Sequence, residues 1–198
     1  MRHVNCSQRV KTLFFITSIA ALSLTSGCDK TVEWKEEVKL NDGRIIAVTQ
    51  RKRCERGDYR ANKDATCIAR ESWLTVRLPE FSDGDIVWHE NLKPMVINVD
   101  EGQLYVVGLP PTSLEFRNYG AHNPPYLGFR WNKRDWIRIN FTQIPKSIYE
   151  TNMLIENIPR NRTSFLRLAA KDSELENGNP VYPAYFRRID PTFKISIN

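Results

Sequence analysis

The fold class is first indicated by residues 32–49, VEWKEEVKLNDGRIIAVT. Apolar and polar residues nearly alternate in the first half of this stretch, and Glu36 interrupts the apolar series. The letters NDG at positions 41–43 are typical of a tight turn between two strands. A second run rich in β-branched and apolar residues follows at positions 44–49. Alternation, turn and return together predict a β-hairpin.

The same pattern recurs along the rest of the chain. Two more hairpins are expected. In one, strands at 95–99 and 103–107 flank a turn at 100–102; in the other, strands at 126–131 and 136–139 flank a turn at 132–135. Further strands are expected within 67–78 and at 86–88 and 192–197, a short helix within 146–157, and loops at 110–125 and 172–183. Short strands separated by turns predict a mainly β fold: an antiparallel β-sandwich or partly open barrel built from hairpins, with at most one or two short helices.

The N-terminal residues have the three-part layout of a secretory signal peptide. Residues 1–12 are polar and positively charged, residues 13–24 are apolar and uncharged, and residues 25–27 are small. Twelve helical residues extend about 18 Å, which is shorter than the hydrocarbon core of a bilayer, about 30 Å. We therefore expect a cleaved export signal rather than a permanent transmembrane helix.

Residues 24–28, LTSGC, resemble the lipobox of bacterial lipoproteins, with Thr25 at the position where leucine is most common. The resemblance implies cleavage after Gly27 and attachment of lipid to Cys28. Without this resemblance, the same segment fits an ordinary secreted protein. Asp29 resembles the retention signal that keeps enteric lipoproteins in the inner membrane, which favours the inner over the outer membrane.

These features divide the chain into three parts. Residues 1–27 are the expected signal peptide, residues 28–31 the lipidated N-terminus with a short tether, and residues 32–198 a single β-rich periplasmic domain. A chain of 198 residues is long enough for one such domain with a substantial core.

The four cysteines are Cys6, Cys28, Cys54 and Cys67. Cys6 would leave with the signal and Cys28 would carry lipid. Cys54 and Cys67 then remain as an even pair in an oxidising compartment, which predicts a disulfide bond. A zinc site would need further ligands nearby, and a redox dithiol usually has the spacing Cys-x-x-Cys, which this chain lacks.

The formal net charge of +6 overstates the basic character of the mature domain. Arg2, Arg9 and Lys11 account for half of it and belong to the expected signal, which leaves +3. This balance is too mild to indicate a nucleic-acid partner. Basic residues do gather beside the expected disulfide loop and are candidates for contact with anionic lipid headgroups, although they also fit a solvated loop: Arg51, Lys52, Arg53 and Arg56.

Catalytic motifs are sparse. The mature chain has two histidines, His89 and His122, and lacks both Gly-x-Ser-x-Gly and His-Glu-x-x-His. A glycosidase needs two opposed carboxylates, and the candidates are Glu36, Glu37, Asp83, Asp85, Asp100 and Glu101. Aromatic residues that either form core or line a glycan- or peptide-binding face are Tyr119, Tyr126, Phe129, Trp131 and Trp136.

The sequence DGR at 42–44, with Tyr119-Gly120 and the later PPYLGF at 124–129, resembles a group of uncharacterised proteobacterial lipoproteins. The resemblance spans residues 32–140 and implies no activity. We expect a lipid-anchored envelope protein with a non-enzymatic binding or assembly role near its membrane. An envelope hydrolase acting on glycan or peptide, and an immunity or inhibitor lipoprotein, are the alternatives. We expect no cofactor, no metal and no nucleic-acid partner; the partner is a membrane-proximal protein or envelope component.

Overall fold

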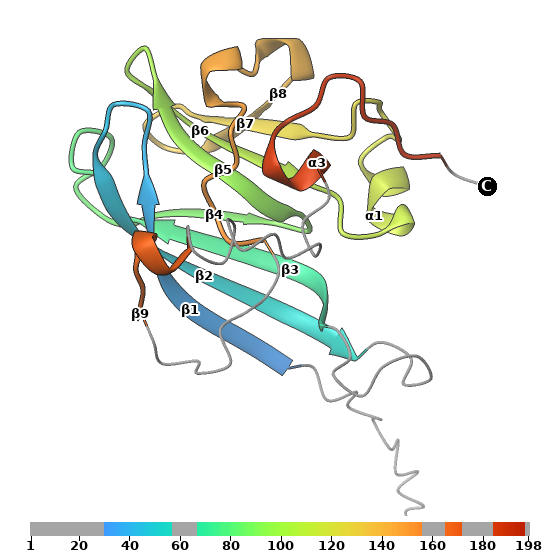
Figure 1. Ribbon diagram of the computed structural model, residues 1–198, viewed down its shortest axis with the longest axis horizontal. Coiled ribbons are helices and arrows are strands. Elements are labelled where there is room, and N and C mark those ends of the chain that lie inside the picture. The colour runs from blue at the N-terminus through green and yellow to red at the C-terminus, as the bar shows by residue number, and fades with distance from the viewer. Residues whose placement is uncertain (1–29, 57–66, 156–164, 172–183, 197–198) are drawn as a thin grey trace, which may run out of the picture.

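The computed structural model describes residues 30–56, 67–155, 165–171 and 184–196, and Figure 1 shows two β-sheets with a few short helices. Sheet A has the strand order β4-β3-β2-β1-β9 and sheet B the order β5-β6-β7-β8. The strands of sheet A are β1 (Lys30–Lys39), β2 (Ile45–Arg56), β3 (Cys67–Val76), β4 (Ile86–Glu90) and β9 (Phe165–Leu166). Those of sheet B are β5 (Lys93–Asp100), β6 (Gln103–Leu109), β7 (Leu127–Trp131) and β8 (Trp136–Ile139).

Neighbouring strands are antiparallel, except for the short parallel pair of β1 and β9. The three expected hairpins are β1–β2, β5–β6 and β7–β8. Gly43 takes a φ of +86° in the first turn, a conformation that glycine adopts without strain. The predicted antiparallel sandwich built from hairpins is thus confirmed, and the two sheets do not close into a barrel.

The two sheets differ in how they are buried. Along β1 every second side chain is buried, so sheet A has one covered face and one solvated face. In β5 and β6, by contrast, Met95, Val96 and Ile97 and the whole run from Leu104 to Leu109 are buried. Such continuous apolar runs are typical of strands that are covered on both faces.

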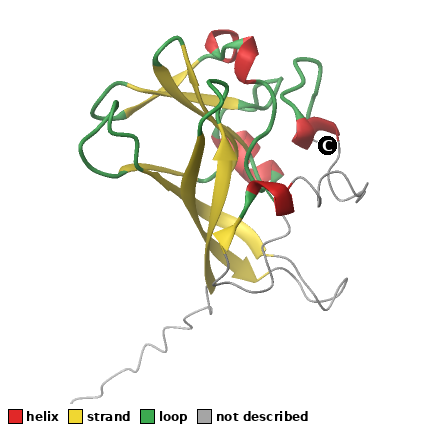
Figure 2. Ribbon diagram, turned by 60° about the vertical axis from the view of Figure 1, so that its left-hand side comes forward, coloured by secondary structure: helices red, strands yellow, loops and turns green. Residues whose placement is uncertain are grey.

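Two apolar clusters follow from this arrangement. One lies between the sheets and includes Leu74, Ile86 and Trp88 from sheet A with Ile97, Leu104 and Phe129 from sheet B. The other includes Tyr105 and Val107 of sheet B with residues of the C-terminal part: Ile144, Ile148, Tyr149, Phe186 and Ile189. The helical pieces η1 (Phe141–Gln143), η2 (Lys146–Ile148) and α3 (Ala184–Arg187) belong to this cover, and Figure 2 shows the helices beside the strands rather than between them.

Helix α1 (Ser113–Asn118) lies inside the segment predicted to be a loop, so that prediction is wrong there. Thr112 caps the helix just before its first residue: its hydroxyl accepts a hydrogen bond from the Leu114 N–H and donates one to the Glu115 carboxylate. This is an N-terminal cap of the Thr-x-x-Glu type. The cap stabilises a helix between the two proline pairs that suggested a loop.

The predicted helix within 146–157 is also wrong beyond η2. The main chain of this segment hydrogen-bonds to other parts of the fold: the Met153 N–H donates to the Met95 carbonyl, and the Leu154 N–H donates to the Glu36 carboxylate. The expected strand at 192–197 is absent from the described residues 192–196, where the Thr192 N–H donates instead to the Asp190 carboxylate. The loop predicted at 172–183 lies outside the described residues.

Among the described helices, none combines the length and the apolar character needed to cross a bilayer.

Candidate functional site

The expected lipidation residue Cys28 and the sorting residue Asp29 lie outside the described residues. Strand β1 begins at Lys30, inside the tether predicted at 28–31. Lys30 pairs with Cys54 near the end of β2, and β3 begins close by at Cys67. We call this the anchor end of sheet A.

The register between β2 and β3 also bears on the predicted disulfide. Cys54 lies opposite Ala69, and Cys67 lies opposite Arg56. Cys67 is two residues before Ala69 in β3. This register is compatible with a Cys54–Cys67 bond, which stays a prediction because the Cys67 side chain lies outside the described ones.

The outer, solvated face of sheet A carries five contacting side chains near the anchor end: Arg51, Arg53, Glu71, Trp73 and His89. We call them the outer-face cluster. The Trp73 and His89 rings are stacked, with centroids 4.5 Å apart and planes at 12°. The Arg51 guanidinium carbon lies 4.2 Å from the centroid of the Trp73 ring. Arg51 and His89 come from the strands on either side of β3, so they flank the indole of Trp73 from both sides.

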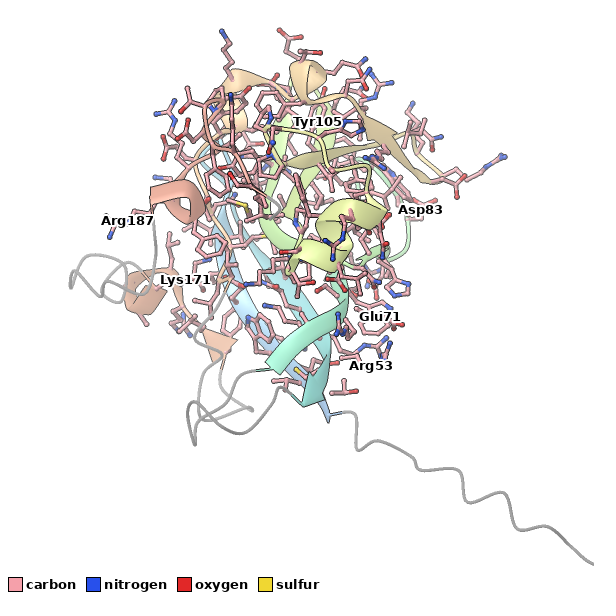
Figure 3. All side chains as sticks on the ribbon, turned by 90° about the vertical axis from the view of Figure 1, so that its right-hand side faces the viewer. Arg53, Glu71, Asp83, Tyr105, Lys171 and Arg187 are labelled. Atoms are coloured by element: carbon pink, nitrogen blue, oxygen red, sulfur yellow. The ribbon has the colours of Figure 1, made fainter. Side chains whose placement is uncertain are left out.

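Ion pairs complete the outer-face cluster. Arg53 Nη2 lies 2.9 Å from a Glu71 carboxylate oxygen, and His89 Nε2 lies 3.6 Å from the other. Figure 3 labels Arg53 and Glu71, which lie near each other on neighbouring strands. The hydrogen bond from Arg53 holds the pKa of the Glu71 carboxyl below its usual value. The cluster is therefore an exposed, charged and aromatic surface rather than a pocket.

Only part of the predicted anionic-surface contact fits this geometry. Arg51 and Arg53 lie on the outer face, as that prediction requires. Lys52 points the other way because successive side chains of a strand alternate between faces. It is 4% exposed, and its Nζ donates to the Ile155 carbonyl at 2.6 Å, so its assignment to a headgroup contact is wrong. The Arg56 side chain lies outside the described ones.

The carboxylates predicted for a hydrolase are not brought together in opposed pairs. Glu36 and Glu37 are consecutive in β1 and face opposite sides of the sheet. Asp83 and Asp85 are exposed in the turn before β4. Asp100 ends β5 and accepts a hydrogen bond from the Ser147 hydroxyl, and Glu101 lies in the following turn with a φ of +46°.

His122 and the aromatic residues lie apart from the outer-face cluster. His122 is exposed and lines a shallow depression together with Tyr119 and Tyr126. The Tyr119 hydroxyl donates to the Glu90 carboxylate at 2.6 Å, and burial, aided by this hydrogen bond, raises the pKa of the phenol. Tyr126 and Phe129 are core residues, whereas Trp131 and Trp136 are half-buried with ring centroids 5.3 Å apart.

A second group of polar side chains, which local sequence patterns barely indicate, is buried against the inner face of sheet A. We call it the inner polar cluster; its members are at most 4% exposed and comprise Glu36, Gln50, Lys52, Ser72 and Lys171. Lys171 Nζ lies 2.5 Å from Glu36 Oε2, and Gln50 Nε2 lies 2.5 Å from Glu36 Oε1. Figure 3 labels Lys171. Glu36 was visible as an interruption of the alternation in β1, but its partner Lys171 is 135 positions further along the chain.

The inner polar cluster holds residues 152–155, which we call the strap. The Leu154 N–H donates to both Glu36 oxygens, at 3.0 and 3.2 Å, and the Leu154 carbonyl accepts from Gln50 Nε2 at 3.0 Å. The Ile155 and Asn152 carbonyls accept from Lys52 and Lys171, each at 2.6 Å. On the other side, the Asn152 side chain hydrogen-bonds to the main-chain N–H and carbonyl of Ile97 in β5. The strap thus joins the inner face of sheet A to the edge of sheet B.

Within the part of the chain that the structure describes, no three residues of the types His, Cys, Asp and Glu are grouped so that they could hold a metal ion. Comparison with protein-family models, with curated proteins and with solved structures finds no match to this chain. Its function therefore has to be inferred from the geometry.

Proposed function

We propose that this chain is a lipid-anchored protein of the bacterial envelope that binds a membrane-proximal protein, without a catalytic role, through the outer-face cluster. Cys28 would carry the lipid at the periplasmic face of the inner membrane, with Asp29 as the sorting residue. The observation that carries this proposal is the position of the exposed outer-face cluster beside the strand end to which the lipid would be attached.

The distances between the cluster and the anchor are short. Arg51 pairs with Glu33, three residues into β1, which is about 10 Å from Lys30. Lys30 lies two positions after Cys28, a step that spans at most about 7 Å. Each strand beyond β1 adds about 5 Å across the sheet, so the cluster on β2, β3 and β4 would lie within roughly 25 Å of the lipidated residue.

The chemistry of the outer-face cluster suits a protein partner better than a small planar ligand. Arg51 and His89 already flank the Trp73 ring, so a ligand has no free ring face on which to stack. What remains is a flat surface that combines arginine, tryptophan and a carboxylate. Tryptophan and arginine are enriched in protein interfaces and carry a large share of their binding energy.

Site-specific photo-crosslinking in intact cells tests this role. A photoreactive residue at Val87, which is 47% exposed beside the cluster, is compared with one at Ile45, which is 56% exposed on the same face at the opposite end of the sheet. We expect a protein adduct from position 87 in large excess over position 45, and its loss in the Cys28→Ser chain. Equal yields at the two positions, or an adduct that survives Cys28→Ser, would contradict the proposal. An adduct with lipid alone would assign the surface to headgroups instead.

The anchor itself is tested separately. Mass spectrometry of the N-terminal peptide should show a chain that begins with acylated Cys28, and any other N-terminus would refute lipidation at this residue. Membrane fractionation should place the wild-type chain in the inner membrane and the Asp29→Ser chain in the outer membrane. Outer-membrane location of both would refute the retention role of Asp29.

A further inference from the structure

The inner polar cluster recognises the strap through its main chain. Among the described contacts, every hydrogen bond between the strap and Glu36, Gln50, Lys52 or Lys171 uses a main-chain group of the strap: Glu36 accepts from an N–H, and the other three donate to carbonyls. They involve one N–H and three carbonyls within four consecutive residues. Recognition of this kind places no demand on hydrogen bonding by the side chains of the bound segment, and it is how proteins commonly hold extended peptides.

Among the described residues, two buried polar atoms of the same region have no hydrogen-bond partner. They are Gln50 Oε1 and Ser72 Oγ, from side chains that are each 1% exposed. Lys52 lies opposite Ser72 and two positions from Gln50, so both atoms belong to the inner polar cluster. Buried polar groups in native proteins are nearly always paired, and an unpaired one calls for an explanation. The strap therefore leaves hydrogen-bonding capacity unused that another occupant can fill.

If the strap only covered the core, apolar side chains beneath it would stabilise the fold at least as well as polar ones. Toward the turn the same inner face is apolar, with Val38, Val76 and Ile86 beyond Glu36 and Gln50, and Val32 and Trp34 beside the polar side chains are apolar as well. Replacing a buried ion pair by well-packed apolar residues is often neutral or stabilising. The charged and amide side chains are thus better explained by the binding of a peptide main chain than by the stability of the fold.

We propose that the inner polar cluster is a binding site for an extended peptide segment of a partner protein, and that the strap occupies this site in the structure. The side chains of Met153, Leu154 and Ile155 are at most 4% exposed, so the segment that replaces them should be apolar at consecutive positions. This site lies on the face of sheet A opposite to the outer-face cluster and does not depend on the function proposed for that surface.

Titration with a synthetic peptide tests the proposal on the full chain. The probe is a fluorescent peptide with the sequence of residues 150–155, and the matched control is the same peptide N-methylated at the residue that corresponds to Leu154. N-methylation removes the N–H whose hydrogen bond Glu36 accepts, so we expect it to weaken peptide binding about tenfold. Equal binding of the two peptides would overturn recognition through the main chain.

The strap competes with the added peptide, so loosening it should tighten binding. Leu154→Pro removes the same N–H from the strap and leaves all five side chains of the inner polar cluster in place. We expect this chain to bind the peptide at least about tenfold more tightly than the wild type. A folded Leu154→Pro chain that does not bind would overturn the proposal. If the variant does not fold, the wild-type chain is titrated to high peptide concentration instead. Failure to reach saturable binding there would also overturn the proposal. A dimer seen by native mass spectrometry, without peptide binding, would assign the site to a second copy of the chain and not to a partner.

Discussion

The inner face of sheet A has two halves that differ in chemistry. Toward the β1–β2 turn it is apolar and packs against sheet B through residues such as Val38, Val76 and Ile86. Toward the anchor end it is mixed: Glu36, Gln50 and Lys52 hold the strap by hydrogen bonds, and the apolar Val32 and Trp34 are buried beside them. We call the two parts the apolar half and the polar half. The two halves bury their side chains equally well, so burial alone does not explain why one of them is charged. The apolar half accounts for the fold, and the polar half is the part that needs a functional explanation.

Removal of one charge from the polar half should have the largest effect on stability. Lys171→Met leaves Glu36 fully buried without its ion-pair partner, and we expect a loss of about 4 kcal/mol in the free energy of unfolding. Urea denaturation measures this change. The double variant Glu36→Met with Lys171→Met should recover most of the loss, because the carboxylate that Lys171 neutralises is then removed as well. A double variant as unstable as the single one would show that the ion pair itself stabilises the fold.

Truncating a side chain in the apolar half should lower the free energy of unfolding slightly less, and it should leave peptide binding unchanged. Ile86 is 1% exposed in the core between the sheets and lies opposite Val76, and Ile86→Ala should lower the free energy of unfolding by about 3.5 kcal/mol through the cavity it leaves. The same titration with the peptide of residues 150–155 should give an unchanged affinity. A large change in affinity would mean that the two halves are not independent.

The predicted disulfide would stabilise the strand ends beside the polar half. Replacing both Cys54 and Cys67 by serine should lower the free energy of unfolding by roughly 3 kcal/mol, because a loop of this size is then no longer closed in the unfolded chain. Non-reducing peptide mapping of protein from the envelope checks the bond directly. Two free thiols in that protein would contradict the prediction.

The smallest effect is expected on the opposite, solvated face. Arg53 lowers the pKa of Glu71, so this contact stabilises the fold above the ordinary pKa of glutamate, about 4.3, and is lost as the pH falls through the lower pKa of the folded state. Both side chains are about one-third exposed, and solvent screening limits the contribution to less than about 1 kcal/mol. In the Glu71→Gln chain, the free energy of unfolding should therefore fall less steeply between about pH 5 and pH 3, by less than about 1 kcal/mol in total. A steeper profile in the variant would contradict the assignment.

The hairpins were predictable because their signals are local. The β5–β6 turn, for example, has positive φ at Glu101 and Gly102, as expected where glycine follows two acidic residues. Helix α1 was missed because the flanking prolines outweighed Thr112 and Glu115, although the spacing of these two residues is that of a helix cap.

The inner polar cluster was only half predictable. Glu36 was visible as an interruption of the alternation in β1, and the same rule should have placed Lys52 on the inner face. The strap could not be foreseen, because its hydrogen-bond partners Glu36 and Met95 are distant in sequence. A short helix was predicted in that segment, and hydrogen bonds from distant parts of the fold to its main chain take the place of helical ones.

Native-state hydrogen exchange of the Leu154 amide tests the central claim most directly, because this N–H is bound by Glu36 only while the strap occupies the site. We predict that Leu154 exchanges by local opening, with a lower free energy than the amides of strand β6, and that Ile86→Ala leaves this opening energy unchanged. Exchange of Leu154 only through global unfolding, at the same free energy as β6, would show that the strap is a permanent part of the core and would contradict the account.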